Sequence, residues 1–111
     1  MTEAGLSARV VLTTAASIEE ARRLGQTLVE ERLAACATLV PAVESIYRWE
    51  GNVERAAETL LVIKTTADRV AALEERLHQL HTYDTPEFLV LQVESGSAKY
   101  LAWLDAGVHV D

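Results

Sequence analysis

Imidazole, phenol and carboxylate side chains lie together in the segment at positions 81–87, which reads His-Thr-Tyr-Asp-Thr-Pro-Glu. An amphipathic run precedes this segment and an apolar run follows it, so its polar groups fall at the boundary between two elements. Two further stretches also hold more chemically special side chains than plain scaffold needs: 45–51 has aromatic and charged groups, and 62–66 has a lysine followed by two threonines. These three stretches hold the main candidates for binding chemistry.

The candidate metal ligands lie in and just before the first segment. Glu74, His78 and His81 are spaced i, i+4 and i+7, so on a helix they share one face. That face would direct two imidazoles and a carboxylate at a borderline metal such as Zn²⁺ or Cu²⁺. Alternatively, His81 is structural, since the dipole of a helix favours an imidazolium in its last turn, and His78 is a solvent residue. The spacing leaves both interpretations open.

A second hypothesis places Lys64, Tyr83 and Glu87, together with His81, in an intersubunit cleft that binds a small ion or a metabolite. Lys64 ends a buried apolar run. The alternative for this lysine is a salt bridge to Glu87 or Asp84.

Tyr47, Trp49 and Trp103 are predicted to be packing or interface anchors, because aromatic side chains dominate buried contacts. Cys36 is predicted to be a small buried hydrophobic residue rather than a thiolate ligand or nucleophile. As the single cysteine of the chain, it cannot form an intramolecular disulfide.

Hydrophobic periodicity predicts the elements that position these residues. Ser17 and Glu20 form a capping box at the start of a first helix, and Thr66 or Asp68 caps a second helix. A hairpin turn is expected at Gly51-Asn52, and Pro41 indicates a bulge or an edge. The strands are predicted at 9–14, 35–50, 58–65 and 87–93, and a terminal helix at 97–106.

This β-α-β-β-α-β order plus a tail helix is typical of the split βαβ arrangement, an α+β fold whose antiparallel sheet is covered by helices on one face. The strand at 58–65 has an unbroken apolar centre and is therefore expected to be central. Apolar residues also occur on the other face of the sheet, which predicts that another subunit covers that face.

The composition excludes several classes of protein. The net charge of −7 argues against a nucleic-acid partner, because phosphate binding needs clustered lysine and arginine. No stretch is apolar enough for a membrane span or a signal peptide, so the cytoplasm is the expected compartment. The 111 residues show no linker and are expected to form a single domain, 1–111, with an ordered core of about 9–106.

This chain lacks the signature residues of three other functions that occur on similar folds. The central strand has no stacking aromatic for RNA binding, and one cysteine cannot supply the Cys-x-x-Cys loop of a soft-metal chaperone. The loop after the first strand, 13–17, has no arginine to bind an anion as in an acylphosphatase.

Five sequence blocks in order resemble the CutA divalent-ion tolerance family, from about Val10 to Leu104. They are Leu-Ala-Ala-Cys-Ala at 33–37, Ser-Ile-Tyr-Arg-Trp-Glu-Gly at 45–51, Ile-Lys-Thr at 63–65, the segment 81–87, and Tyr-Leu-Ala-Trp at 100–103. The resemblance implies a ferredoxin-like protomer and a tight trimer whose architecture is similar to that of PII signalling proteins. It implies no catalysed reaction.

Two departures from the family pattern concern the candidate site. Thr82 stands where the family usually has proline, so a looser turn is expected. A copper-binding set proposed in the family has a cysteine and two adjacent histidines, and the matching positions here are Thr13, Leu80 and His81. Only one of the three ligands is present.

The sequence therefore predicts a non-enzymatic homotrimer involved in divalent-metal (copper) tolerance. It would bind divalent cations weakly, with no required cofactor and Cu²⁺ or another divalent cation as its ligand. The alternative is a PII-like regulatory trimer that binds a small metabolite in its intersubunit clefts.

Overall fold

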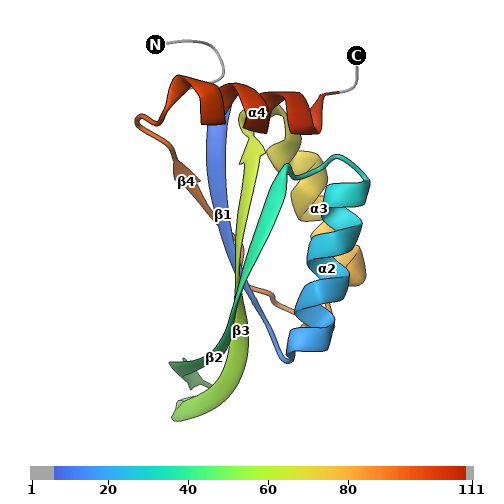
Figure 1. Cartoon of the computed structure of the whole chain (residues 1–111). Coiled ribbons are helices and arrows are strands. Elements are labelled where there is room, and N and C mark those ends of the chain that lie inside the picture. The colour runs from blue at the N-terminus through green and yellow to red at the C-terminus, as the bar shows by residue number, and fades with distance from the viewer. Residues whose placement is uncertain (1–6, 110–111) are drawn as a thin grey trace.

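A four-stranded antiparallel sheet with strand order β2-β3-β1-β4 forms the centre of the molecule (Figure 1). The computed structural model describes residues 7–109. Its elements are β1 (Ala8–Ala15), α2 (Ile18–Glu30), β2 (Cys36–Trp49), β3 (Asn52–Thr66), a 3-10 turn (Ala67–Arg69), α3 (Val70–Leu80), β4 (Leu89–Gln92) and α4 (Ala98–Val108). The expected α+β, ferredoxin-like βαββαβ fold with a C-terminal helix is confirmed.

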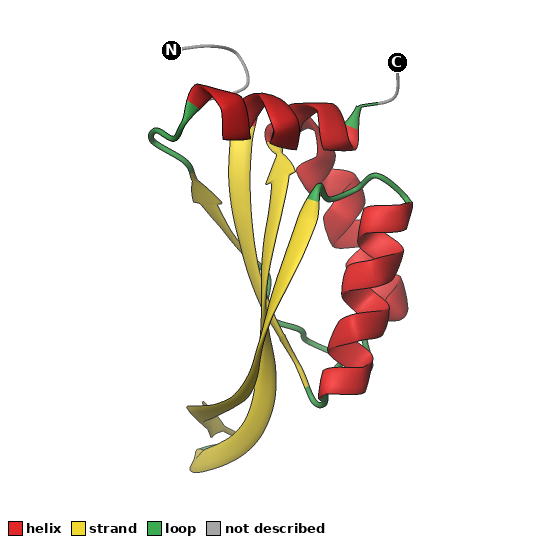
Figure 2. Ribbon diagram, in the orientation of Figure 1, coloured by secondary structure: helices red, strands yellow, loops and turns green. Residues whose placement is uncertain are grey.

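Helices α2 and α3 lie on one face of the sheet, and α4 crosses one end of it (Figure 2). The core lies between the first two helices and the sheet, where Leu24 and Leu28 meet Leu73, Leu77 and Ile63. Gly25 allows close approach of α2, because a Cβ at this position would lie 3.1 Å from the Cβ of Ala37.

Ser17 begins α2 as predicted, and its hydroxyl accepts a hydrogen bond from the Glu20 N–H at 3.1 Å. The reciprocal half of the capping box differs from the prediction. The Glu20 carboxylate accepts instead from the N–H of Ala16, at 3.2 Å, and from Thr82. One side chain therefore links the helix start to a segment far along the chain.

The β2–β3 hairpin is longer than predicted, because β3 begins at Asn52 rather than Glu58. Its turn is Glu50-Gly51, with φ of 49° and 84°, whereas Asn52 already pairs with Trp49. The predicted irregularity at Pro41 is confirmed: the register shifts between Val40 and Val43. The hairpin accounts for the elongated shape of the molecule, 45 × 25 × 22 Å.

The predicted cap of α3 by Thr66 or Asp68 is wrong, because a 3-10 turn precedes the helix and Arg69 occupies the N-cap position. The Thr66 hydroxyl donates instead to Asp68 Oδ1 at 2.5 Å, and His109 Nε2 lies 2.8 Å from Asp68 Oδ2. These contacts lower the pKa of Asp68, and the hydrogen bond to Asp68 raises that of His109. The contact between Asp68 and His109 holds the end of α4 against the 3-10 turn.

The sheet face opposite α2 and α3 is largely apolar, with Lys64 and Thr38 among its residues, and is only partly covered. Helix α4 covers the end near Ala8, through Leu101 and Leu104. The remainder is called the open face here and comprises Val10, Leu12, Val40, Leu60, Val62, Leu89 and Leu91. Leu89 and Leu91 are 55% and 48% exposed. Strand β3 is central, as predicted, but this chain buries it fully on one face only.

Candidate functional site

A cleft of about 690 Å³ lies where the β2–β3 hairpin approaches the loop that leads from α3 to β4. The residues that line it are Thr14, Ser45, Tyr47, Trp49, Glu58 and those at 82–87. Ser45, Tyr47 and Trp49 alternate along β2, so the strand presents all three on the same face. The cleft thus unites Tyr83 and Glu87 with two of the predicted interface aromatics.

His81 is buried behind this loop, and both of its ring nitrogens are hydrogen-bonded. Its Nδ1 accepts from the Tyr83 N–H at 3.0 Å, which requires the proton to be on Nε2. Nε2 donates to the carbonyl oxygen of Thr14 at 2.7 Å. The imidazole therefore fastens the loop to the end of β1 and has no free lone pair for a metal in this arrangement.

The predicted helix-face triad does not form, because His81 is buried whereas Glu74 and His78 are exposed. Hydrogen bonds to Thr14 and Tyr83 hold the His81 ring inside the protein, so it does not face solvent as Glu74 and His78 do. Within residues 7–109, no three His, Cys, Asp or Glu side chains are placed to share a metal ion. The His78 ring is exposed and packs near Phe88, with ring centroids 6.5 Å apart.

Glu20 is a buried acidic residue that organises the other side of the loop. Its Oε2 accepts from Thr82 N at 3.0 Å and Thr82 Oγ1 at 2.8 Å. Burial alone would raise the pKa of this carboxyl, but the hydrogen bonds from Thr82 and Ala16 outweigh burial and hold the pKa below its ordinary value. Thr82 supplies two donors that proline lacks, and both bind the turn to Glu20.

Tyr83 and Glu58 form the polar floor of the cleft. The Tyr83 hydroxyl donates to Glu58 Oε2 at 2.6 Å. Burial, followed by the Glu58 carboxylate, raises the pKa of Tyr83, so the phenol stays neutral. Sequence reasoning did not single out Glu58. The signal available was a carboxylate two residues before the apolar run 60–63 of a central strand, where a charge is expensive to bury.

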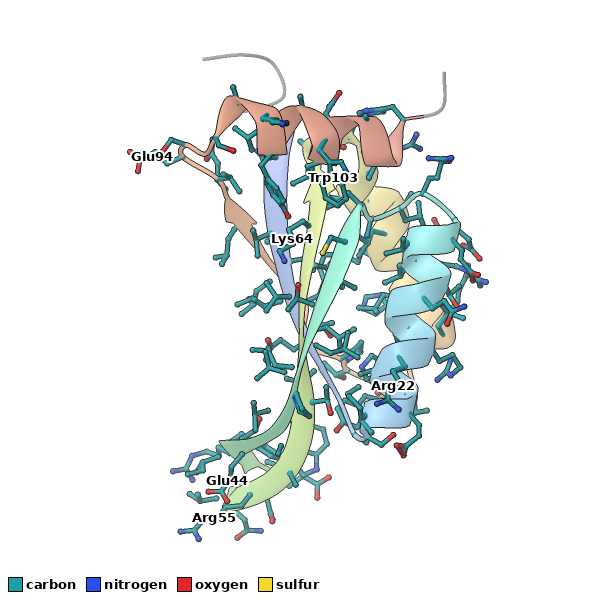
Figure 3. All side chains as sticks on the ribbon, viewed as in Figure 1. Arg22, Glu44, Arg55, Lys64, Glu94 and Trp103 are labelled. Carbon is teal, nitrogen blue, oxygen red and sulfur yellow. The ribbon has the colours of Figure 1, made fainter. Side chains whose placement is uncertain are left out.

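Lys64 does not line this cleft of the single chain, and its alternative salt bridge to Glu87 or Asp84 is wrong. Its ammonium donates to Thr38 Oγ1 at 2.7 Å and lies 3.7 Å from Cys36 Sγ, both on the neighbouring strand. Figure 3 shows Lys64 well away from the hairpin tip, where Glu44 and Arg55 lie. Cys36 is half-buried beside this lysine rather than a core residue.

The three predicted interface aromatics are all largely exposed in the single chain. Trp49 and Tyr47 lie on the hairpin, and Trp49 is 56% exposed. Trp103 lies on α4 and stacks on Tyr100, with ring centroids 5.5 Å apart. Their exposure is compatible with an interface, and their role there stays a prediction.

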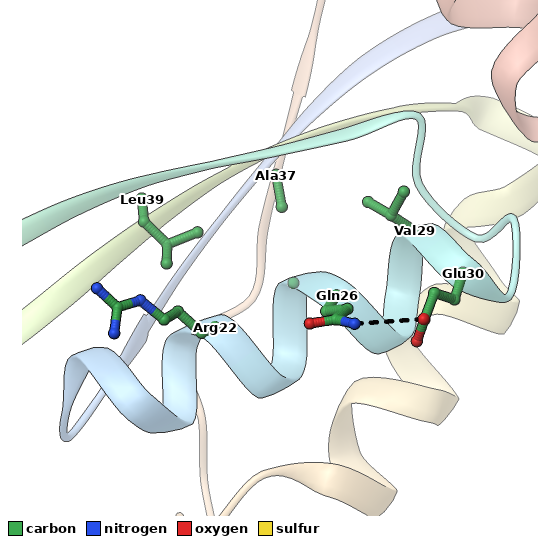
Figure 4. A pocket seen from close by; sticks show the side chains of 7 residues that line it. Arg22, Gln26, Val29, Glu30, Ala37 and Leu39 are labelled. Carbon is green, nitrogen blue, oxygen red and sulfur yellow. Dashed lines mark hydrogen bonds between the residues drawn. The ribbon is translucent and has the colours of Figure 1, made fainter.

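A second hollow, of about 510 Å³, lies between α2 and the edge strand β2 (Figure 4). Arg22, Gln26 and Glu30 border it from the helix, and Gln26 donates to Glu30 at 3.3 Å. Leu39 borders it from the strand. None of the predicted site residues lies in this hollow.

Comparison with known proteins identifies a matching family. The family model described as CutA1 divalent ion tolerance protein matches residues 9–107. The divalent-cation tolerance protein CutA of Thermus thermophilus is 48% identical over 95 residues, which cover 86% of this chain and 92% of that protein.

Two solved structures are similar to this chain in fold as well as in sequence. CutA1 from Oryza sativa has a TM-score of 0.92 and 38% identity, covering 98% of this chain and 100% of that one. The structure described as the periplasmic divalent cation tolerance protein CutA from Archaeoglobus fulgidus has a TM-score of 0.89 and 33% identity, covering 92% and 99% of the two chains. From its sequence and from its fold, this chain belongs to the CutA1 divalent ion tolerance family.

Proposed function

We propose that this protein acts in divalent-cation tolerance as a homotrimer, without catalysing a reaction. The observation that carries the proposal is the family match over residues 9–107. The open face supports assembly, because seven apolar residues in one contiguous sheet surface are unfavourable in water unless another subunit covers them.

Light scattering tests the assembly directly. A closed three-fold trimer should have about three times the 12.2 kDa chain mass, and this mass should not change with dilution across the micromolar range. Cyclic closure buries every open face equally, which is the physical reason for this expectation. A stable mass of one chain would contradict the trimer, and a mass of two chains would contradict three-fold closure.

We further propose weak binding of Cu²⁺ or another divalent cation at the exposed face of α3. Both nitrogens of His81 are hydrogen-bonded, and both nitrogens of His109 contact acidic residues or a carbonyl. His78 is the remaining imidazole, and among residues 7–109 it makes no hydrogen bond. Glu74 lies one turn before it on the same helix face. Two donors completed by water predict modest affinity.

Calorimetric titration with Cu²⁺ and Zn²⁺ at pH 7.5 tests this site. Cu²⁺ should bind more tightly than Zn²⁺, following the divalent affinity order for nitrogen and oxygen donors. His78→Ala should remove most of the binding, while Glu75→Ala, next to the site on another helix face, should preserve it. Binding should fade below about pH 6, where imidazole protonates. Undiminished copper binding by His78→Ala would contradict the assignment.

The cleft supports a second candidate function, a regulatory trimer that binds a small ligand there. The observation that favours it is Glu58, an acidic residue only 9% exposed, in a cleft large enough for a small molecule. Tyr83 and Glu87 line this cleft, and a place for Lys64 in an intersubunit cleft stays a prediction.

We propose the cytoplasm as the compartment. No described helix has the length and apolar character needed to cross a membrane. The CutA of Archaeoglobus fulgidus is described as periplasmic, so fractionation of cells that express the tagged protein is the test.

A further inference from the structure

We propose that the cleft binds a small organic ammonium ion. In this arrangement, Glu58 is the counter-ion, and the rings of Tyr47 and Trp49 form the walls against which the apolar body of the ligand packs. The inference rests on the cleft-binding function proposed above and names the ligand class for it.

The first argument is the isolation of a buried charge. Glu58 is 9% exposed, and the one hydrogen bond to its carboxylate comes from a neutral phenol, that of Tyr83. Among residues 7–109, no Lys, Arg or His nitrogen lies within 4.0 Å of this carboxylate. A buried carboxylate without a cation is unfavourable, because desolvation is not repaid by an ion pair. A cation that enters the cleft supplies the missing partner.

The second argument is the rest of the lining, which carries no positive charge. Asp84 and Glu87 add negative potential, and the overall charge of −7 attracts cations over a longer range. Tyr47 and Trp49 present aromatic rings, whose faces attract cations and whose area accommodates an apolar body. An anionic metabolite would meet three carboxylates and no lysine or arginine in this cleft.

The third argument separates an organic cation from a metal ion. No three metal-ligating side chains converge among the described residues, and the cleft volume of about 690 Å³ far exceeds what a bare ion fills.

The floor of the cleft, formed by Tyr83 and Glu58, is also preorganised. The N–H of Tyr83 donates to His81, whose ring in turn donates to the Thr14 carbonyl, and these bonds hold the residue whose phenol positions Glu58. A preformed floor lowers the entropic cost of binding a small ligand.

The test compares two probes that differ mainly by charge, 2-phenylethylamine and the neutral 2-phenylethanol, by calorimetry on the intact protein at pH 7.5. The amine should bind at least about tenfold more tightly than the alcohol. Glu58→Gln should weaken amine binding at least about tenfold, and Trp49→Leu should weaken it severalfold. Glu30→Gln, which changes a carboxylate at the other hollow, should bind the amine like the wild type.

Light scattering and thermal unfolding of each variant establish that it is assembled and folded. The proposal is overturned if the amine and the alcohol bind equally, if neither binds, or if Glu58→Gln binds the amine like the wild type. It is also overturned if Glu58→Gln dissociates the oligomer, because a basic side chain of a neighbouring subunit would then be the counter-ion.

A thermal-shift screen of neutral and anionic compounds distinguishes this failure from failure of the cleft-binding function. A neutral compound that stabilises the wild type but not Trp49→Leu would keep the cleft function and reject the ammonium class. If no compound of any charge stabilises the protein, both the ammonium class and the cleft function are rejected.

Discussion

Leu91→Glu is expected to elute as a folded monomer, whereas Val29→Glu keeps the mass of the wild-type assembly. Leu91 lies on β4 in the open face, opposite Val10, and is 48% exposed in the single chain. A glutamate there remains hydrated in a monomer, but in an assembly it would be buried among apolar residues. Burying an unpaired carboxylate costs several kcal/mol, and the cost recurs at every copy of the interface.

Val29 is the matched control, because it is 37% exposed and lies on α2, which packs on the opposite face of the sheet. Light scattering gives the mass of each variant, and far-UV circular dichroism establishes that each is folded. A Leu91→Glu variant that keeps the wild-type mass would show that the open face is not the interface. Equal dissociation of both variants would show that the effect is not specific to this face.

The order of elements could be predicted from the sequence because each has a local pattern. The alternation in β2 and the apolar centre of β3 were sufficient to predict a hairpin with β3 central in the sheet. The first part of β3, 52–57, was missed because it is polar and small, with Glu54 and Arg55 where strand formers are usual. Pairing with the similarly long β2, rather than its own propensity, holds this part in a strand.

The predicted metal triad of Glu74, His78 and His81 was inferred from spacing along one helix. Such spacing places side chains on a common face but does not show which other elements bury one of them. Hydrogen bonds to Thr14 and Tyr83 hold the His81 ring inside the protein, whereas Glu74 and His78 are exposed. Thr14 is 67 residues away in the chain, so the helix pattern alone could not predict this contact.

The contacts of Lys64 and Glu20 illustrate a different limit of prediction from the sequence. Lys64 was assigned a partner by charge, but its ammonium donates to the hydroxyl of Thr38 on the adjacent strand, two residues beyond Cys36, which the register pairs with Lys64. Glu20 was read as part of a local capping box, whereas two of its hydrogen bonds come from Thr82, 62 residues away. A local pattern cannot contain a contact of that range, so the sequence alone did not identify Glu20 as the anchor of the site loop.

Glu20→Gln is expected to destabilise the protein by about 2–4 kcal/mol at pH 7, because an amide cannot accept all the hydrogen bonds that the carboxylate accepts. The carboxylate accepts from Ala16 N, Thr82 N and Thr82 Oγ1, and the amide NH₂ of glutamine would face donors on one side. Glu19→Gln, an exposed change in the same turn, should stay within about 0.5 kcal/mol of the wild type.

The difference between wild type and Glu20→Gln should depend on pH with a definite sign. The folded-state pKa of Glu20 is lowered, so the carboxylate stabilises the fold fully above the ordinary glutamate pKa of about 4.3. This contribution is lost as the pH falls from that value through the lower folded-state pKa. Urea unfolding at one fixed protein concentration, at pH 7 and at several values below pH 5, measures it. The wild-type advantage should shrink towards the acidic end. An advantage that is constant with pH would show that the effect is one of shape rather than charge, and that the carboxylate does not hold the loop.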